Sequence, residues 1–223
     1  MIERVNNVAN NAIYELRIIR GVYIMAMNFK VFPTADKAAR YSADIIRKTF
    51  NNNPTTIMGV HLADDNAPVL EDLKQNVLRN PVDFSQINIL DYDENKSYYE
   101  TLGVPSTQVY SLSYNDGVVD FIEENIKSKE NKAKFTLQVL TINDKGSLDI
   151  AVKSGVMPAR EVILVVTGPE KAELVKKLYE ENGNSSYVPS DLKAHRMVNV
   201  ILDEAAAEGL PEDVRHYFTE RFA

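Results

Sequence analysis

From Asn28 onward, short strand-like segments alternate with longer helix-like segments, and this alternation constrains the fold more than any other feature of the chain. Residues 162–166 form a continuous apolar run of strand length, whereas Thr34–Phe50 carries its apolar side chains at helical spacing. Strands that are separated by helices pair in parallel, because each crossover brings the chain back to the same edge of the sheet. The sequence therefore predicts a Rossmann-like α/β fold, with a mainly parallel sheet flanked by helices on both faces.

The elements follow from periodicity and from turn residues. The predicted strands are Phe29–Phe32, Thr55–His61, Gln86–Leu90, Gln108–Leu112, Phe135–Ile142, Glu161–Thr167 and Met197–Leu202. The predicted helices are Thr34–Phe50, Asp65–Leu78, Asp116–Ile126, Glu170–Asn182 and Pro211–Phe222. Parallel sheets bind ligands beyond the carboxyl ends of their strands. A binding site is therefore expected in the loops after His61, Leu90, Ile142 and Thr167.

Composition excludes several classes of function. The net charge of −7 argues against nucleic-acid binding, which needs a clustered basic surface. The longest apolar run, residues 162–166, is far too short to cross a membrane. The chain has no cysteine, which excludes disulfides and thiolate metal sites and fits a cytoplasmic protein.

Neither a cofactor nor a metal is expected. The three histidines, His61, His195 and His216, do not have the spacing of metal ligands. His195 is expected to pack or hydrogen-bond near a helix end, and His216 to be exposed on the last helix. The sequence also contains no Walker-type loop, no G-x-S-x-G elbow and no dinucleotide fingerprint.

Residues 1–27 are interpreted as an N-terminal extension, and residues 28–223 as one α/β domain. No signal-peptide cleavage site follows the basic and aliphatic patch at Leu16–Arg20. Arg20–Val22 can be encoded by a purine-rich stretch that resembles a bacterial ribosome-binding site, a short distance upstream of Met25 and Met27. A misassigned start codon is therefore favoured over an amphipathic helix for this segment.

Two strand ends carry candidate site residues. At Gly168–Lys171 a strand ends in a glycine turn and a helix begins with a lysine in its first turn, so backbone N–H groups and an ammonium could attract an anion. The alternative is an ordinary surface lysine. At the other strand end, Asp91 could act as a base if it is partly withdrawn from water, or it could simply cap the following turn.

Four segments together resemble the glucosamine-6-phosphate deaminase and 6-phosphogluconolactonase family. They are Ala159–Leu164, Gly168–Ala172, Val188–His195 and Val200–Ala206, in the order and spacing of the family's G-x-x-K-A, V-P-A-S-x-L-x-x-H and x-L-D-x-x-A-A patterns. The resemblance implies a sugar-phosphate isomerase type of fold and a role in amino-sugar or sugar-phosphate metabolism. It also implies that Lys171 contacts the phosphate and that Asp91 moves a proton during ring opening and isomerisation.

The sequence departs from the family at the positions that carry the chemistry. Tyr92 stands where the family has glutamate, and Ser147 stands where the family has the catalytic histidine, although Gly146 is retained. A hydroxyl group cannot replace imidazole as a proton shuttle near neutral pH. In the first phosphate loop, Asp64 and Asp65 would repel a phosphate unless His61 compensates. Between the histidine-position loop and the next strand, only Leu148–Pro158 remains of a longer family segment that includes lid residues.

Three functions follow as hypotheses. The first is a glucosamine-6-phosphate deaminase-like protein with impaired or altered catalysis, and the second is a non-catalytic descendant that binds a sugar phosphate or another protein. The third is a 6-phosphogluconolactonase-like hydrolase. In the first, Asp91 is the catalytic residue, and Lys171, Gly168, Gly146, Ser147 and His61 are the substrate-binding residues, all expected to meet at one pocket. The oligomeric state is left open, with a homo-oligomer as one option.

Overall fold

The computed structural model describes residues 27–63, 67–112, 118–126, 134–148, 156–181 and 187–220, without the side chains of Val118 and Glu220. Residues 1–26, the acidic pair Asp64 and Asp65, and residues 149–155 of the shortened segment lie outside the described residues. The interpretations placed on them stay predictions.

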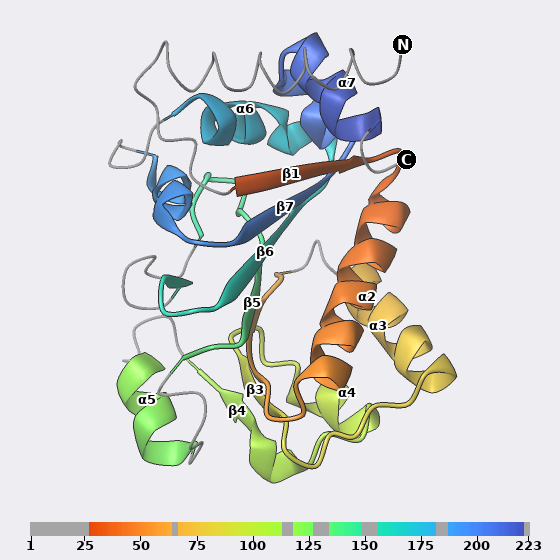
Figure 1. Cartoon of the computed structure of the whole chain (residues 1–223), viewed down its shortest axis with the longest axis vertical. Helices are drawn as coiled ribbons and strands as arrows, with labels where there is room; N and C mark the ends of the chain where they lie inside the picture. Colours follow the sequence, from red (N-terminus) through yellow and green to blue (C-terminus); the bar gives the residue numbers. More distant parts are fainter. Residues whose placement is uncertain are drawn as a thin grey trace, which may run out of the picture.

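The described residues form one sheet of seven strands in the order β1-β7-β6-β5-β2-β3-β4, and every pair of neighbours is parallel (Figure 1). The strands are β1 (Met27–Phe32), β2 (Ile57–His61), β3 (Asn88–Asp91), β4 (Val109–Ser111), β5 (Leu137–Leu140), β6 (Glu161–Val166) and β7 (Val198–Asp203). The predicted α/β class is confirmed, and the sheet is parallel throughout.

The described residues form six α-helices, and two 3₁₀ turns lie at the carboxyl ends of β6 and β7. The helices are α2 (Ala35–Asn52), α3 (Ala67–Arg79), α4 (Lys96–Thr101), α5 (Val118–Asn125), α6 (Ala172–Glu180) and α7 (Glu212–Glu220). The turns are η4 (Pro169–Lys171), directly before α6, and η6 (Ala206–Gly209), directly after β7. Helices α2, α3 and α4 cover one face of the sheet, and α5, α6 and α7 cover the other (Figure 1).

Both faces of the sheet are buried around β6, so this strand is apolar at every position after Glu161. Along β6, Val162, Leu164 and Val166 pack into the hydrophobic cluster under α5, α6 and α7. Ile163 and Val165 point the other way, into the cluster under α2, α3 and α4. This two-sided burial explains the continuous apolar run that the sequence shows here.

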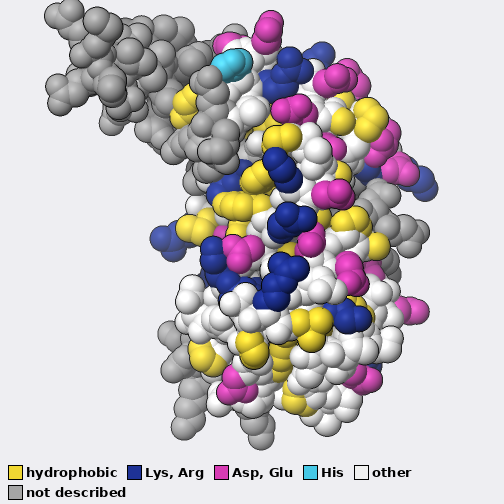
Figure 2. Space-filling model, turned by 90° about the vertical axis from the view of Figure 1, so that its right-hand side faces the viewer, with side chains coloured by type: hydrophobic (Ala, Val, Ile, Leu, Met, Phe, Trp, Pro, Cys, Tyr) yellow, Lys and Arg dark blue, Asp and Glu magenta, His cyan; other side chains and the backbone are white. Residues whose placement is uncertain are grey.

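The outer surface of α2 and α3 carries mixed charge. Figure 2 shows Lys and Arg side chains interspersed with Asp and Glu over this face. On α2, Asp44 pairs with Lys48 at 2.6 Å and with Arg47 at 3.3 Å. Positive charge on this helix is therefore partly neutralised locally. In the part of the chain that the structure describes, no helix is both long and apolar enough to cross a membrane.

Candidate functional site

The predicted site residues all lie at the carboxyl edge of the sheet, at the ends of four adjacent strands. From one side to the other, these strands are β6, β5, β2 and β3. Lys171 and Gly168 follow β6, Gly146 and Ser147 follow β5, His61 ends β2, and Asp91 ends β3. The parallel topology therefore brings segments that are distant in the sequence to one edge.

The turn after β6 is fixed by a glycine and by an aspartate from β7. Gly168 has a φ of 97°, which residues other than glycine rarely adopt. Its N–H donates to Asp203 Oδ1 at 3.1 Å, and the same oxygen accepts the N–H of Ala206 at 2.9 Å. Asp203 thus links the ends of β6 and β7 and stabilises the turn that leads into Lys171.

Lys171 is buried, but its anionic partner is not. The lysine is only 2% exposed, and its Nζ donates to the carbonyl oxygen of Ile142 at 2.9 Å and to Asp144 Oδ1 at 2.6 Å. The Asp144 side chain is 84% exposed. The hydrogen bond and the charge of Lys171 lower the pKa of the Asp144 carboxyl, so Asp144 is ionised near neutral pH. The ammonium group of Lys171 is therefore held inside the protein, whereas the carboxylate that balances its charge lies at the surface.

Gly146 and Ser147 shape the loop that carries Asp144. Gly146 has a φ of 77°, and a Cβ built there would lie 2.9 Å from Leu174 Cδ2. The N–H of Ser147 donates to Asn143 Oδ1 at 2.9 Å, and the N–H of Asn143 donates to the carbonyl oxygen of Ser147 at 2.9 Å. These two positions therefore have a structural role in the loop, whatever they do for a ligand.

Asp91 is fully buried and holds the turn after β3. One carboxylate oxygen accepts the N–H of Asp93 at 3.2 Å, and the other accepts the N–H of Asn95. Burial raises the pKa of Asp91 to about 6, even though both N–H groups favour the carboxylate; the negative charges of Asp93 and Glu94 raise it further. This is the turn-capping arrangement that the sequence left open as an alternative.

His61 is engaged by a residue that the sequence did not single out. Its Nδ1 lies 2.6 Å from Oδ1 of Asp93, and both side chains are nearly buried, at 4% and 10% exposed. The other oxygen of Asp93 accepts the N–H groups of Leu62 and Ala63. His61 and Asp91 are thus joined through the loop that contains Asp93.

The structure does not bring Asp91 and Lys171 together. Leu90 points into the cluster under α5, α6 and α7, so the alternation along β3 directs Asp91 to the opposite face, toward α4. Lys171 approaches the edge from the face that α6 covers. Two strands, β5 and β2, lie between their strands, which separates the strand ends by ~14 Å.

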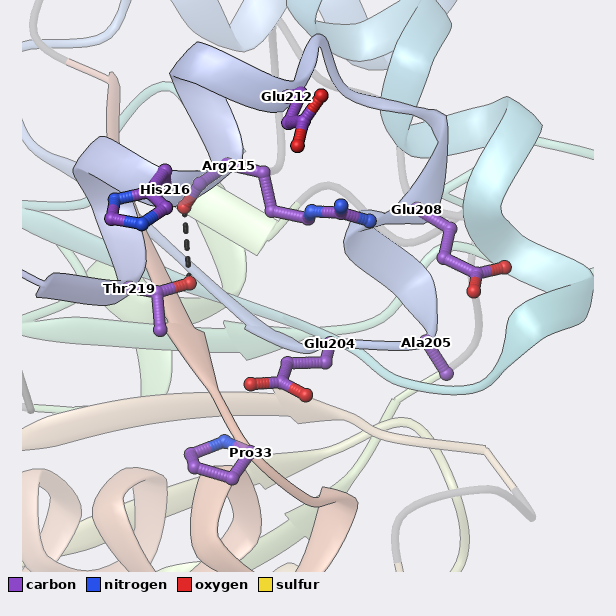
Figure 3. A pocket seen from close by; sticks show the side chains of 8 residues that line it. All are labelled: Pro33, Glu204, Ala205, Glu208, Glu212, Arg215, His216 and Thr219. Atoms are coloured by element: carbon purple, nitrogen blue, oxygen red, sulfur yellow. Dashed lines mark hydrogen bonds between the residues drawn. The ribbon is translucent and has the colours of Figure 1, made fainter.

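A pocket of about 660 Å³ lies elsewhere on the same edge, beyond β1 and β7. In Figure 3, its α7 side chains lie on one side, and Glu204 and Pro33 lie on the other. It is lined by Pro33, Glu204, Ala205, Glu208, Glu212, Arg215, His216 and Thr219, and by none of the predicted site residues. Thr219 Oγ1 donates to the Arg215 carbonyl oxygen at 3.0 Å within α7.

The remaining histidines behave as predicted. His195 is buried, its Nε2 lies 2.8 Å from the carbonyl oxygen of Ala159, and its Nδ1 accepts the N–H of Met197 at 3.1 Å. His216 is exposed on α7. Among the described residues, no group of three or more acidic or histidine side chains is arranged to hold a metal ion.

Sequence comparison finds relatives that are named glucosamine-6-phosphate deaminase. A glucosamine-6-phosphate deaminase of Oceanobacillus iheyensis is 37% identical over 65 residues, which is 29% of this chain and 25% of that protein. The chain spans only about a quarter to a third of the first curated relatives that it matches. A glucosamine-6-phosphate deaminase of Thermoanaerobacter sp. (strain X514) is 20% identical, over 80% of this chain and 93% of that protein. No family model matches the chain.

Structure comparison finds the same fold in solved enzymes. A monomeric glucosamine-6-phosphate deaminase superposes with a TM-score of 0.66 at 15% identity, covering 82% of this chain and 100% of that one. The 6-phosphogluconolactonase of Trypanosoma brucei superposes with a TM-score of 0.62 at 14% identity, covering 84% and 100%. The chain is therefore similar in sequence to glucosamine-6-phosphate deaminases, and it shares the fold of those enzymes and of 6-phosphogluconolactonases.

Proposed function

We propose that this chain binds a phosphorylated sugar at the loops after β5 and β6, and that it does not deaminate or isomerise that sugar. The observation that carries the proposal is the buried ammonium of Lys171, whose counter-ion Asp144 is 84% exposed. A phosphate group can take the place of Asp144, because the exposed carboxylate can turn into water while the phosphate supplies the negative charge that the buried ammonium needs. The relatives named glucosamine-6-phosphate deaminase support a sugar phosphate as the ligand class.

Two residues, Asp91 and Ser147, are unsuited to the proton transfers that turnover would need. Both oxygens of Asp91 accept backbone N–H groups of its own turn, so neither is directed at a ligand bound by Lys171. Ser147 replaces the histidine that the family resemblance implies, and a hydroxyl group does not shuttle protons near pH 7. Proton transfer to and from a sugar therefore has no suitably placed group among these residues.

A second candidate is an enzyme with altered catalysis, either deaminase-like or lactonase-like. One observation favours it: burial raises the pKa of Asp91 to about 6, which suits a general base at neutral pH. This candidate requires the turn after β3 to open, so that a ligand can reach the carboxylate.

The proposal is tested by stability measurements with matched ligands. Glucosamine 6-phosphate and fructose 6-phosphate are compared with glucosamine and fructose, and the ionic strength of all samples is made equal with sodium chloride. We expect only the phosphorylated sugars to protect against thermal unfolding, by about 2.7 kcal/mol at a concentration of 100 times Kd. Equal protection by phosphorylated and unphosphorylated sugars would rule the proposal out.

Turnover is measured in the same preparation. A coupled assay for ammonia and fructose 6-phosphate should give no signal above the no-protein control, even at protein concentrations that saturate the ligand. Turnover that disappears in Asp91→Asn would instead establish the enzyme candidate.

A further inference from the structure

The 3₁₀ turn η6 packs against the start of α6 at a glycine. A Cβ built on Gly209 would lie 2.4 Å from the carbonyl oxygen of Ala172 and 3.0 Å from its carbonyl carbon. Both atoms belong to the backbone, so neither can move aside as the end of a flexible side chain can. Ala172 directly follows Lys171, so this contact bears on the backbone that carries the buried lysine.

The segment after β7 also holds the chain on the other side of Lys171. Asp203 Oδ1 accepts the N–H groups of Gly168 and Ala206, so it connects the turn before the lysine to the first residue of η6. Lys171 itself donates its N–H to the carbonyl oxygen of Gly168 at 3.2 Å. Residues 203–209 therefore support the backbone on both sides of the lysine.

We propose that η6 positions Lys171, and that Gly209 is the positioning residue, because its missing side chain sets how closely η6 approaches the first turn of α6. Lys171 is buried, so its side chain has no free space in which to compensate for a shift of its backbone. The position of its ammonium group relative to Ile142 and Asp144 then follows the position of η6. The ligand in this inference, a phosphorylated sugar, rests on the proposed function.

The turn η6 is fixed in the core, so a side chain at position 209 would displace the chain around the lysine. Ala206 and Ala207 are fully buried. Gly209 is not among the glycines with a positive φ, so alanine can adopt its backbone conformation. The cost of Gly209→Ala is then the clash with Ala172, and overpacking of this kind shifts the backbone. The substitution is therefore a specific perturbation of this contact.

The position of Lys171 can be measured through the carboxyl group of Asp144, without a ligand. The hydrogen bond and the charge of Lys171 lower the pKa of that carboxyl, so a displaced lysine lets the pKa rise toward its ordinary value. A pH titration followed by carboxyl-carbon NMR compares the wild type with Gly209→Ala. We expect a higher pKa of Asp144 in the variant, and an affinity for glucosamine 6-phosphate that is about tenfold weaker.

Two control variants separate positioning from a general loss of stability. Glu208→Ala changes an exposed side chain of the same turn, which lines the pocket beyond β1 and β7 (Figure 3). Val69→Ala removes buried apolar atoms of α3, in the cluster on the other face of the sheet. Both controls should keep the pKa of Asp144 at its wild-type value, although Val69→Ala lowers the midpoint of urea unfolding.

A raised pKa of Asp144 in Gly209→Ala, but in neither control, supports the proposal. An unchanged pKa in Gly209→Ala overturns it, and so does an equal rise in Val69→Ala. Because this measurement needs no ligand, it decides the proposal even if the wild type does not bind glucosamine 6-phosphate. That failure would contradict the proposed function alone.

If Gly209→Ala does not fold, Asp203→Ser takes its place. The serine hydroxyl can still accept the N–H of Ala206, as a helix-capping serine does, but it is too short to reach Gly168 as well. The turn η6 then keeps its cap and loses its link to the chain before Lys171, so the pKa of Asp144 should again rise. Loss of the negative charge at position 203 can only lower that pKa, so a rise reports a displaced lysine, and no rise overturns the proposal.

Discussion

Two carboxylates at the same edge of the sheet, each in contact with a buried side-chain nitrogen, differ in whether the carboxylate itself is buried. At the end of β2, both His61 and Asp93 are nearly buried, and Asp93 also binds two backbone N–H groups. After β6, Lys171 is buried but Asp144 is 84% exposed and contacts the lysine through a single oxygen. A buried anion is costly to displace, because its donors would be left without an acceptor, whereas an exposed anion can exchange for water or a ligand. We therefore expect the first pair to stay intact when a ligand binds, and we call it closed. We expect the second pair to open, because a ligand can replace its exposed carboxylate.

The largest effect is expected for Asp91, which accepts the N–H of Asp93 and so holds the buried carboxylate of the first pair in place, and it concerns the pH dependence of stability. Burial raises the pKa of Asp91 from 3.8 to about 6, so between these values the folded protein retains a proton that the unfolded chain has released. The free energy of unfolding should therefore fall as the pH rises from about 4 to about 6, by about 3 kcal/mol, and level off above that. The comparison protein is Asp91→Asn, which lacks this titration.

Urea unfolding of both proteins between pH 4 and 7 checks the expectation. Other carboxyl groups titrate in both proteins, so their contributions cancel in the difference. A difference between wild type and variant that does not change across this range would contradict the closed arrangement around Asp91.

At the open pair, Lys171→Met should weaken the binding of glucosamine 6-phosphate by about 30-fold, or about 2 kcal/mol. The reason is that the variant loses a charge-assisted hydrogen bond to the phosphate. The matched control is Lys177→Met, since Lys177 is an exposed lysine on α6, outside the loops that are proposed to bind the ligand. Isothermal titration of both variants measures the change. Similar losses in the two variants would mean that general positive charge, and not the buried ammonium, binds the ligand.

A smaller effect is expected from Ala63→Gly. Glycine adopts the φ of 50° found at this position without steric cost, but it also loses more conformational entropy on folding. The substitution should therefore raise the free energy of unfolding by about 0.5–1 kcal/mol. Urea unfolding measures it, and a loss of stability would contradict the strained conformation assigned to the loop.

The smallest effect is expected from Asp144→Asn. Removal of the competing charge should strengthen the binding of glucosamine 6-phosphate by about threefold. The stability should change little, because the introduced amide oxygen can still accept the hydrogen bond of Lys171 Nζ. Isothermal titration against the wild type checks this. Weaker binding would indicate that Asp144 helps to orient the ligand instead of competing with it.

The fold could be predicted because its signals are local. The apolar run at Glu161–Thr167 and the helical stripe in Thr34–Phe50 lie within one or two residues of β6 and α2. The helix predicted to begin at Glu170 is preceded in the structure by the 3₁₀ turn Pro169–Lys171, which a pattern of apolar residues does not distinguish from an α-helix.

The site could be predicted only in part, because its contacts join distant segments. Periodicity located the strand ends of Asp91 and Lys171, but the partners Asp93 and Asp144 depend on which strands lie next to each other. The order of the strands in the sheet cannot be predicted from any single segment of the sequence. A usable signal was present at the end of β2: His61 and Asp93 follow consecutive strands, and strands that are consecutive in sequence are often neighbours in a sheet.

A crystal structure of the protein with glucosamine 6-phosphate tests the central claim most directly. The account predicts a phosphate oxygen within hydrogen-bond distance of Lys171 Nζ, Asp144 turned into solvent, and Asp93 still bound to His61, Leu62 and Ala63. A ligand bound at another place, with the contact between Lys171 and Asp144 intact, would contradict it.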